Sequence, residues 1–208
     1  MKAAVVHALG RPPIYAEVEE PRPVDGQVVA QVRAAAVKNI ERSLVAGTHY
    51  GSSRMRLPGL VGLDAVVSLP DGRRAYAGAA PPGGSMAERV AVDPARVVAL
   101  PDGVDESAAA ALPNAAVSAW FALEYAGGLR PGGAVLVLGG TGVTGSLAVQ
   151  LAKRVFGAGR VVVAGRDPAR LERLTGWGAD AVIRIGGADG IEDAVRREHH
   201  RRPFDVVV

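Results

Sequence analysis

The sequence of 208 residues predicts an α/β protein in which a β-rich module precedes an incomplete, doubly wound parallel sheet. Three observations predict this fold class. Short β-like runs separated by Pro-Gly and Asp-Gly turns fill the first half, a glycine-dense turn lies near residue 140, and strand and helix patterns alternate after it. We therefore expect two domains, a β-rich substrate domain at 1–115 and a nucleotide-binding domain at 116–208.

The first domain contains five predicted strands and one predicted helix. The strands cover residues 2–7, 15–19, 27–33, 64–69 and 87–92, and the helix covers residues 38–46. This spacing is typical of a β-barrel or β-sandwich. Two further helices, at 105–112 and 114–126, lead into the second domain.

The glycine-dense turn follows an apolar strand at 134–138 and contains Gly140, Gly142 and Gly145 in the pattern G-x-G-x-x-G. In this spacing the first glycine permits a tight turn, the second lets the backbone approach a dinucleotide pyrophosphate, and the third lets the helix pack on the strand. The positive end of the helix dipole then holds the anion. An ordinary glycine-rich turn is the alternative. The predicted cofactor-binding residues of the turn are Gly140, Thr141, Gly142, Val143, Thr144 and Gly145.

The remaining sequence repeats strand and helix. After a strand at 161–164, Asp167 and Pro168 open a helix at 169–175, which ends at the glycines around Trp177. A strand at 181–185, a helix at 191–200 and a strand at 204–208 follow. Because a parallel strand is ordinarily covered by later elements, we expect the chain to be a fragment, truncated in the fourth strand of this domain.

The residues after the second strand of this domain indicate the cofactor. NAD sites carry an acidic residue about 20 positions after the glycine turn, where this chain has Gly165 and Arg166. Glycine leaves room for a 2′-phosphate, and Arg166 and Arg170 supply cations that bind it. We therefore expect NADP(H). Asp167 is the alternative: turned toward the ribose, it would favour NADH.

Composition narrows the class of protein. The chain has no cysteine, a net charge of +3 and 49% hydrophobic residues, so disulfides and thiolate metal sites are excluded. No run has membrane-spanning length, and no signal peptide is evident. The basic cluster at 196–202 is typical of a solvated helix C-terminus. We expect a cytoplasmic protein with neither nucleic acid nor a membrane as a partner.

Several motifs in order resemble the medium-chain dehydrogenase/reductase superfamily, and most of all its zinc-independent quinone oxidoreductases. They are Leu-Pro-Asp-Gly-Val at 100–104, an alanine-rich helix, Ser-Ala-Trp at 118–120, Leu-Arg-Pro-Gly at 129–132 and the glycine turn. The resemblance covers essentially the whole chain. It implies a GroES-like β-barrel-type first domain, a Rossmann second domain and a homodimer for the full-length protein.

The resemblance also bears on metal binding. Zinc-dependent members carry a cysteine where this chain has Lys38 and a histidine where it has Leu63, and neither residue present here binds zinc. The four-cysteine structural zinc lobe is absent as well. No metal is therefore expected.

Without a Lewis acid, a substrate carbonyl must be polarised by hydrogen-bond donors. The candidates are Asn39, His49 and Tyr50, with Lys38 adding positive charge. The alternative is that Asn39 caps the helix that starts at Ile40 and that the other two are loop surface residues. Asp64 is interpreted as a turn or supporting residue rather than a catalytic acid.

These features predict an NADPH-dependent reductase that transfers hydride to a quinone or an α,β-unsaturated carbonyl compound. Two alternatives stay open at this stage. One is a non-catalytic NADPH-binding sensor or an inactive fragment, and the other is a polyketide-type enoyl reductase. Atypical short-chain reductases share the G-x-x-G-x-x-G pattern of Gly139, Gly142 and Gly145, but they carry it near the N-terminus, whereas here a β-rich module comes first.

Overall fold

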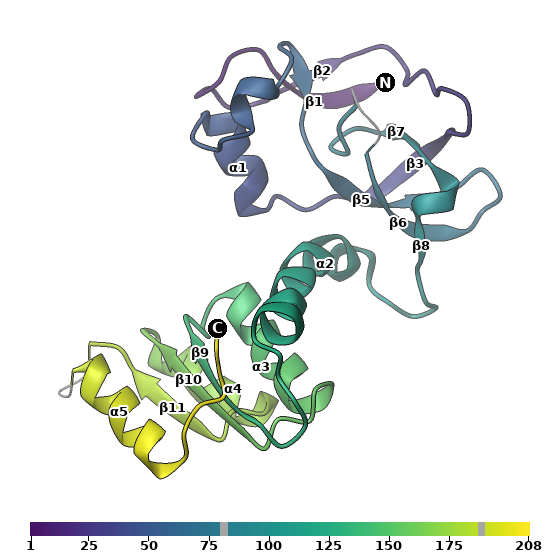
Figure 1. Ribbon diagram of the computed structural model, residues 1–208. Coiled ribbons are helices and arrows are strands. Elements are labelled where there is room, and N and C mark those ends of the chain that lie inside the picture. Colours follow the sequence, from purple (N-terminus) through teal and green to yellow (C-terminus); the bar gives the residue numbers. More distant parts are fainter. Residues whose placement is uncertain (80–82, 187–189) are drawn as a thin grey trace. The chain divides into compact units, whose positions relative to one another are not determined.

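The computed structural model describes residues 1–79, 83–186 and 190–208 (Figure 1). The chain divides into two compact units, Met1–Leu112 and Pro113–Val208. Each unit has its own sheets and its own hydrophobic core.

The first unit is built from two antiparallel sheets. One has three strands in the order β2-β1-β4, and the other has five in the order β7-β3-β5-β6-β8. All five predicted strands are present, with ends shifted by a residue or two, whereas β4, β6 and β8 were not predicted. The strands are β1 (Lys2–Val6), β2 (Ile14–Glu17), β3 (Val28–Ala34), β4 (Gly59–Leu60), β5 (Asp64–Ser68), β6 (Arg74–Gly78), β7 (Arg89–Val92) and β8 (Val98–Ala99).

Side chains along a strand point alternately to the two faces of its sheet, and this alternation explains which residues form the core of this unit. Val67, Ala75 and Val90 lie on inward faces of the five-stranded sheet and are almost fully buried. Helix α1 (Asn39–Ala46) ends at Gly47, whose φ of 79° is the left-handed conformation that favours glycine at a helix C-terminus. Two short 3-10 turns, η1 (Ser52–Arg54) and η2 (Pro94–Arg96), complete the unit.

The two helices predicted at 105–112 and 114–126 are wrong as separate elements. The structure has one α-helix, α2 (Glu106–Phe121), with Pro113 inside it, followed by a π-helical turn, η3 (Ala122–Ala126). A proline removes one backbone hydrogen bond and costs about 3 kcal/mol in a helix interior. The alanines on both sides have the highest helix propensity, and they favour a continuous helix here. Within the part of the chain that is described, no helix is long and apolar enough to cross a membrane.

The second unit is a parallel sheet with helices on both faces, as predicted. Its strands are β9 (Ala134–Leu138), β10 (Arg160–Gly165), β11 (Ala181–Arg184) and β12 (Val206–Val207), in the order β11-β10-β9-β12. Its helices are α3 (Val143–Arg154), α4 (Pro168–Trp177) and α5 (Ile191–Arg201) (Figure 1). The strand predicted at 204–208 is only two residues long.

Successive residues of β9 pack on opposite faces of this sheet. Val135 and Val137 join the core that contains the buried residues of α3 and α4, whereas Leu136 joins the core that contains residues of α5. Both faces of the strand are therefore buried, which is the physical reason that it reads as a continuous apolar run.

Candidate functional site

The turn between β9 and α3 is tight, and Gly139 makes it so. Gly139 has a φ of 71°, which side-chain-bearing residues rarely adopt. The expectation that Gly140 supplies this conformation was wrong, since Gly140 does not have a positive φ. Gly140 is required for another reason: a Cβ there would lie 2.0 Å from Val163 Cγ1 on the neighbouring strand.

Gly145 allows the close packing of α3 that the sequence predicted. A Cβ at this position would lie 2.5 Å from the Gly139 carbonyl oxygen and 2.6 Å from Gly140 Cα. Both contacts are to backbone, so no side-chain rotation relieves them. The first turn of α3 is therefore held directly against the glycine turn.

The first turn of α3 presents free backbone donors. Gly142 is the N-cap residue and has no side chain to satisfy them. The N–H groups of Val143, Thr144 and Gly145 donate to no residue in the described part of the chain. A Cβ added at Gly142 would make only an ordinary van der Waals contact, 3.4 Å from the Gly139 carbonyl oxygen. This arrangement suits an anionic group at the helix N-terminus.

Asp167 is confirmed as the N-cap of α4, since its carboxylate accepts the Arg170 N–H at 3.1 Å. The Arg170 side chain reaches back to the glycine turn, where Nη1 donates to the Thr141 carbonyl oxygen at 3.3 Å. The Arg170 Nε also lies 3.4 Å from the Asp167 carboxylate. Helix α4 therefore places a guanidinium beside the free donors of α3.

Gly165 and Arg166 differ in their surroundings. A Cβ at Gly165 would lie 2.5 Å from Thr141 Cγ2 and 3.1 Å from Leu171 Cδ2, so packing of these side chains accounts for the glycine. The space next to Gly165 is therefore occupied by the protein. Arg166 is exposed, and its guanidinium makes no hydrogen bond or ion pair with any described residue.

A pocket of about 170 Å³ lies between the glycine turn and α4. Four of its residues were missed by the sequence reasoning: Ser146, Arg173, Leu174 and Trp177. The helical spacing offered a signal, because Arg170 and Arg173 are three residues apart and share a face of α4. The pocket is lined by Gly140, Thr141, Gly142, Val143, Ser146, Arg170, Arg173, Leu174 and Trp177.

In the first unit, Lys38 lies at the centre of a buried charge cluster. Its Nζ donates to Asp64 Oδ1 and lies 3.1 Å from Glu41 Oε1. The Lys38 backbone N–H donates to Glu41 Oε2 at 3.0 Å, and Tyr76 Oη donates to Asp64 Oδ2 at 2.7 Å. We call Lys38, Glu41, Asp64 and Tyr76 the Lys38 cluster.

The Lys38 cluster is shielded from solvent. The exposed fractions of the Lys38, Glu41 and Asp64 side chains are 11%, 2% and 10%. Burial, together with the hydrogen bond to Asp64, raises the pKa of the Tyr76 phenol above its usual value of 10.0, so the phenol stays protonated. The sequence reasoning missed Glu41 and Tyr76 and treated Lys38 only as a source of charge.

The other substrate-site candidates do not gather around Lys38. Asn39 is exposed and is the first residue of α1, so the alternative that it caps the helix is wrong: the N-cap is Lys38. His49 and Tyr50 stack with ring centroids 4.2 Å apart beyond the other end of α1, and Tyr50 is 86% exposed. Eight helical residues separate the two helix ends by roughly 12 Å along the axis.

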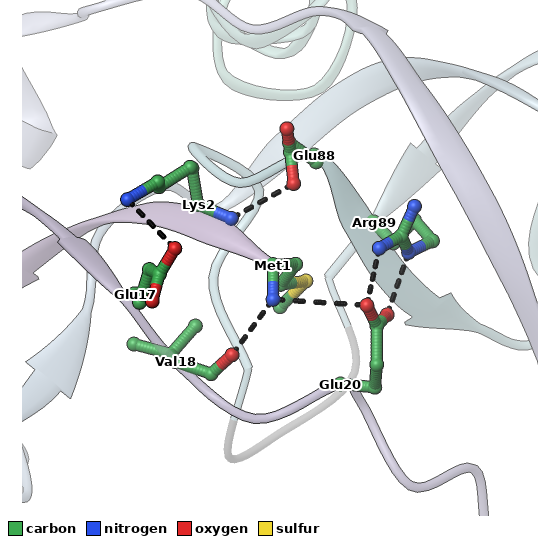
Figure 2. Close-up of polar contacts among 7 residues, drawn as sticks. All are labelled: Met1, Lys2, Glu17, Val18, Glu20, Glu88 and Arg89. Atoms are coloured by element: carbon green, nitrogen blue, oxygen red, sulfur yellow. Dashed lines mark hydrogen bonds and ion pairs between the residues drawn. The ribbon is translucent and has the colours of Figure 1, made fainter.

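The first unit also contains a pocket of about 470 Å³, which is mostly apolar and has paired charges at its rim. Figure 2 shows Arg89 bound through two nitrogens to Glu20, and the Met1 ammonium donating to the Val18 carbonyl oxygen at 2.8 Å. The hydrogen bond from Arg89 is the main reason that the pKa of Glu20 is lowered. Arg22 is likewise paired, with Glu19, so each charged group described at this rim already has a partner.

The chain is similar to several known oxidoreductases, although no family model matches it. A stretch of 100 residues is 40% identical to 2-methylene-furan-3-one reductase of Solanum lycopersicum, a match that covers 48% of this chain and 25% of that enzyme. The whole chain superimposes on 65% of the quinone oxidoreductase of Thermus thermophilus, solved also in complex with NADPH, with a TM-score of 0.84 and 31% identity. It also superimposes on 68% of a probable oxidoreductase of Mycobacterium abscessus, with a TM-score of 0.82 and 30% identity. The chain thus spans a quarter of the tomato enzyme and slightly less than two thirds of the Thermus enzyme.

Proposed function

Because this chain belongs to the medium-chain dehydrogenase/reductase superfamily, among relatives of the quinone oxidoreductases, we propose that it binds NADPH and reduces a quinone or an α,β-unsaturated carbonyl compound. The Thermus relative was crystallised with NADPH, and the tomato relative is a reductase named for an enone. Both likenesses support the same class of reaction.

The observation that carries this proposal is the set of free N–H groups at the start of α3. Three adjacent donors, those of Val143, Thr144 and Gly145, begin α3 next to the pocket that Gly142 lines, and they suit the pyrophosphate of a dinucleotide. When bound, the cofactor supplies the hydride. The protein's part is to bind and orient it.

The preference for NADPH is assigned to the cations near the glycine turn. Arg170 and Arg173 line the pocket beside Gly142, and Arg166, directly after β10, pairs with no described residue. Guanidinium groups bind phosphate through charge-assisted hydrogen bonds. Asp167 is engaged as the N-cap of α4, which leaves it poorly placed to hold ribose hydroxyls.

We propose that zinc takes no part in the reaction. At the position where zinc-dependent relatives carry a cysteine, the Lys38 ammonium is already paired with Asp64 and Glu41. Leu63, at the position of the histidine ligand, has no atom that coordinates a metal.

The test is a fluorescence titration of the purified chain with NADPH and NADH. We expect saturable binding that favours NADPH. Arg166→Ala and Arg170→Ala should each weaken NADPH about tenfold and leave NADH nearly unchanged, because a hydrogen bond to a charged group contributes about 1.5–3 kcal/mol. Arg154→Ala, an exposed arginine at the end of α3, is the matched control.

Turnover is measured on the same samples as NADPH oxidation in the presence of 1,4-naphthoquinone or 2-cyclohexenone. Equal loss of NADPH and NADH in the arginine variants would refute the phosphate assignment. Binding of neither cofactor to the parent chain would refute the proposed function. Binding without turnover of either substrate would favour the non-catalytic alternative.

A further inference from the structure

The Lys38 ammonium has more donors than the protein satisfies. An ammonium group carries three N–H bonds. Within the described part of the chain, Nζ makes one directed hydrogen bond, to Asp64 Oδ1, and one ion pair, to Glu41 Oε1 at 3.1 Å. At least one N–H is therefore left without an acceptor, on a side chain that is only 11% exposed.

The acidic partners fix the position of this ammonium. Asp64 is held by Tyr76 through Oδ2, and its backbone carbonyl oxygen accepts a hydrogen bond from Ser85 Oγ at 2.7 Å. Glu41 is held through its hydrogen bond from the Lys38 backbone N–H. A cation bound from two elements in this way has little freedom, so its remaining N–H has a defined direction.

Charge and polarity at the cluster indicate what binds there. One ammonium faces two carboxylates, so the cluster has no net positive charge that would attract an anionic ligand such as a carboxylate, and the remaining N–H acts as a local hydrogen-bond donor. Val37 precedes Lys38 in the sequence and Leu63 precedes Asp64, and these two apolar side chains are 70% and 40% exposed. A neutral, largely apolar molecule with one strong acceptor oxygen suits both properties.

We propose that Lys38 is a catalytic residue whose free N–H donates a hydrogen bond to the carbonyl oxygen of the substrate. Asp64, Glu41 and Tyr76 are positioning residues that hold the ammonium. The inference rests on the proposed function, because it specifies how the quinone or enone carbonyl is recognised. As reduction places negative charge on that oxygen, the hydrogen bond strengthens and favours the transition state. Lys38 keeps its proton, and the proton that completes the product comes from water.

The experiment measures the carbonyl stretch of 2-cyclohexenone bound to the chain by infrared difference spectroscopy, without NADPH. In the parent chain we expect a stretch at lower frequency than in an apolar solvent, because a hydrogen bond from an ammonium weakens the C=O bond. Lys38→Met should abolish the lowering and weaken enone binding about tenfold. Lys153→Met is the matched control, since Lys153 also pairs with an aspartate, Asp180, at 2.9 Å.

Two further variants keep the test decisive if Lys38→Met does not fold. Lys38→Arg keeps the charge but moves the donors, so the stretch must change. Tyr76→Phe removes the hydrogen bond that holds Asp64, so the Lys38 ammonium is held less firmly. The carbonyl stretch of the bound enone should then be lowered less than it is in the parent chain. Circular dichroism and NADPH affinity should be unchanged.

The outcomes separate this inference from the proposed function. An unshifted stretch in the parent chain, a stretch unaffected by all three cluster variants, or no enone binding would overturn the role of Lys38. The NADPH titration on the same samples reports the proposed function independently. If the parent chain reduces 2-cyclohexenone with NADPH, Lys38→Met should also lower kcat about 100-fold and leave NADPH affinity unchanged. A kcat of this variant within a few-fold of the parent value would contradict the inference.

Discussion

Replacing Gly145 by alanine should destabilise the second unit by forcing α3 away from the glycine turn. The new Cβ would lie 2.5 Å from the Gly139 carbonyl oxygen, whereas ordinary contacts begin at 3.4 Å, and neither the oxygen nor Gly140 Cα can rotate away. Helix α3 must therefore move by roughly 1 Å in a close-packed interior. Its residues Ala148 and Val149 are fully buried, so the movement also loosens the core.

The expected loss is about 1–3 kcal/mol for overpacking, partly offset by about 0.5–1 kcal/mol from the better helix propensity of alanine. The net effect of about 1–2 kcal/mol corresponds to a Tm lower by about 2–8 °C for a chain of this size. Urea unfolding followed by tryptophan fluorescence measures it in the relevant unit, because both tryptophans, Trp120 and Trp177, lie in Pro113–Val208.

Gly176→Ala is the matched control for this substitution. Gly176 also lies within a helix of the same unit, but a Cβ there meets nothing within 4 Å. It should stabilise the chain by about 0.5–1 kcal/mol through helix propensity alone. If Gly145→Ala were as stable as Gly176→Ala, the steric account of the third glycine would be refuted.

Three other substitutions give checkable outcomes. Asp167→Ala removes the N-cap of α4 and should cost about 1 kcal/mol, measured as a lower urea midpoint, with no loss expected for Glu172→Ala, an exposed residue in the interior of the same helix. Leu123→Ala empties a fully buried site and should cost about 2–5 kcal/mol by the same measurement; a smaller loss would mean that the site collapses. The raised pKa of Tyr76 predicts that its contribution to stability is complete below the usual value of 10.0 and declines as pH rises above it, because the unfolded phenol then ionises first. Tyr76→Phe should abolish this part of the alkaline decline in the urea midpoint, and an identical decline in both proteins would contradict the assignment.

The strands that could be predicted were those with a clear apolar pattern. Continuous apolar runs in β9 and β10 predicted the parallel sheet, and short β-like runs between turns predicted five strands of the first unit. Strand β6 was missed because Arg-Ala-Tyr-Ala-Gly has no large aliphatic residue, although the Asp71-Gly72 turn before it was recognised. Pro113 was interpreted as a helix break because a local rule cannot weigh the helix propensity of its flanking alanines.

The turn and the Lys38 cluster show two different limits of sequence reasoning. The motif located the turn correctly but assigned the tight conformation to Gly140 instead of Gly139, since the four glycines at 139, 140, 142 and 145 satisfy two overlapping patterns. The Lys38 cluster depends on strand register: Tyr76 pairs with Val66, which places it diagonally across from Asp64. No spacing along the chain shows this, because residues 38, 64 and 76 meet only after β5 and β6 pair.

The Lys38 cluster obtains its positive charge from a side chain, and this has a consequence for how the first unit responds to its surroundings. A metal ion held by carboxylates is exchanged with solvent and is lost when a chelator competes for it. The ammonium of Lys38 is covalently attached, so its occupancy is complete in every molecule and at any concentration of free ions. We therefore expect the stability of this unit to be the same with and without a chelator.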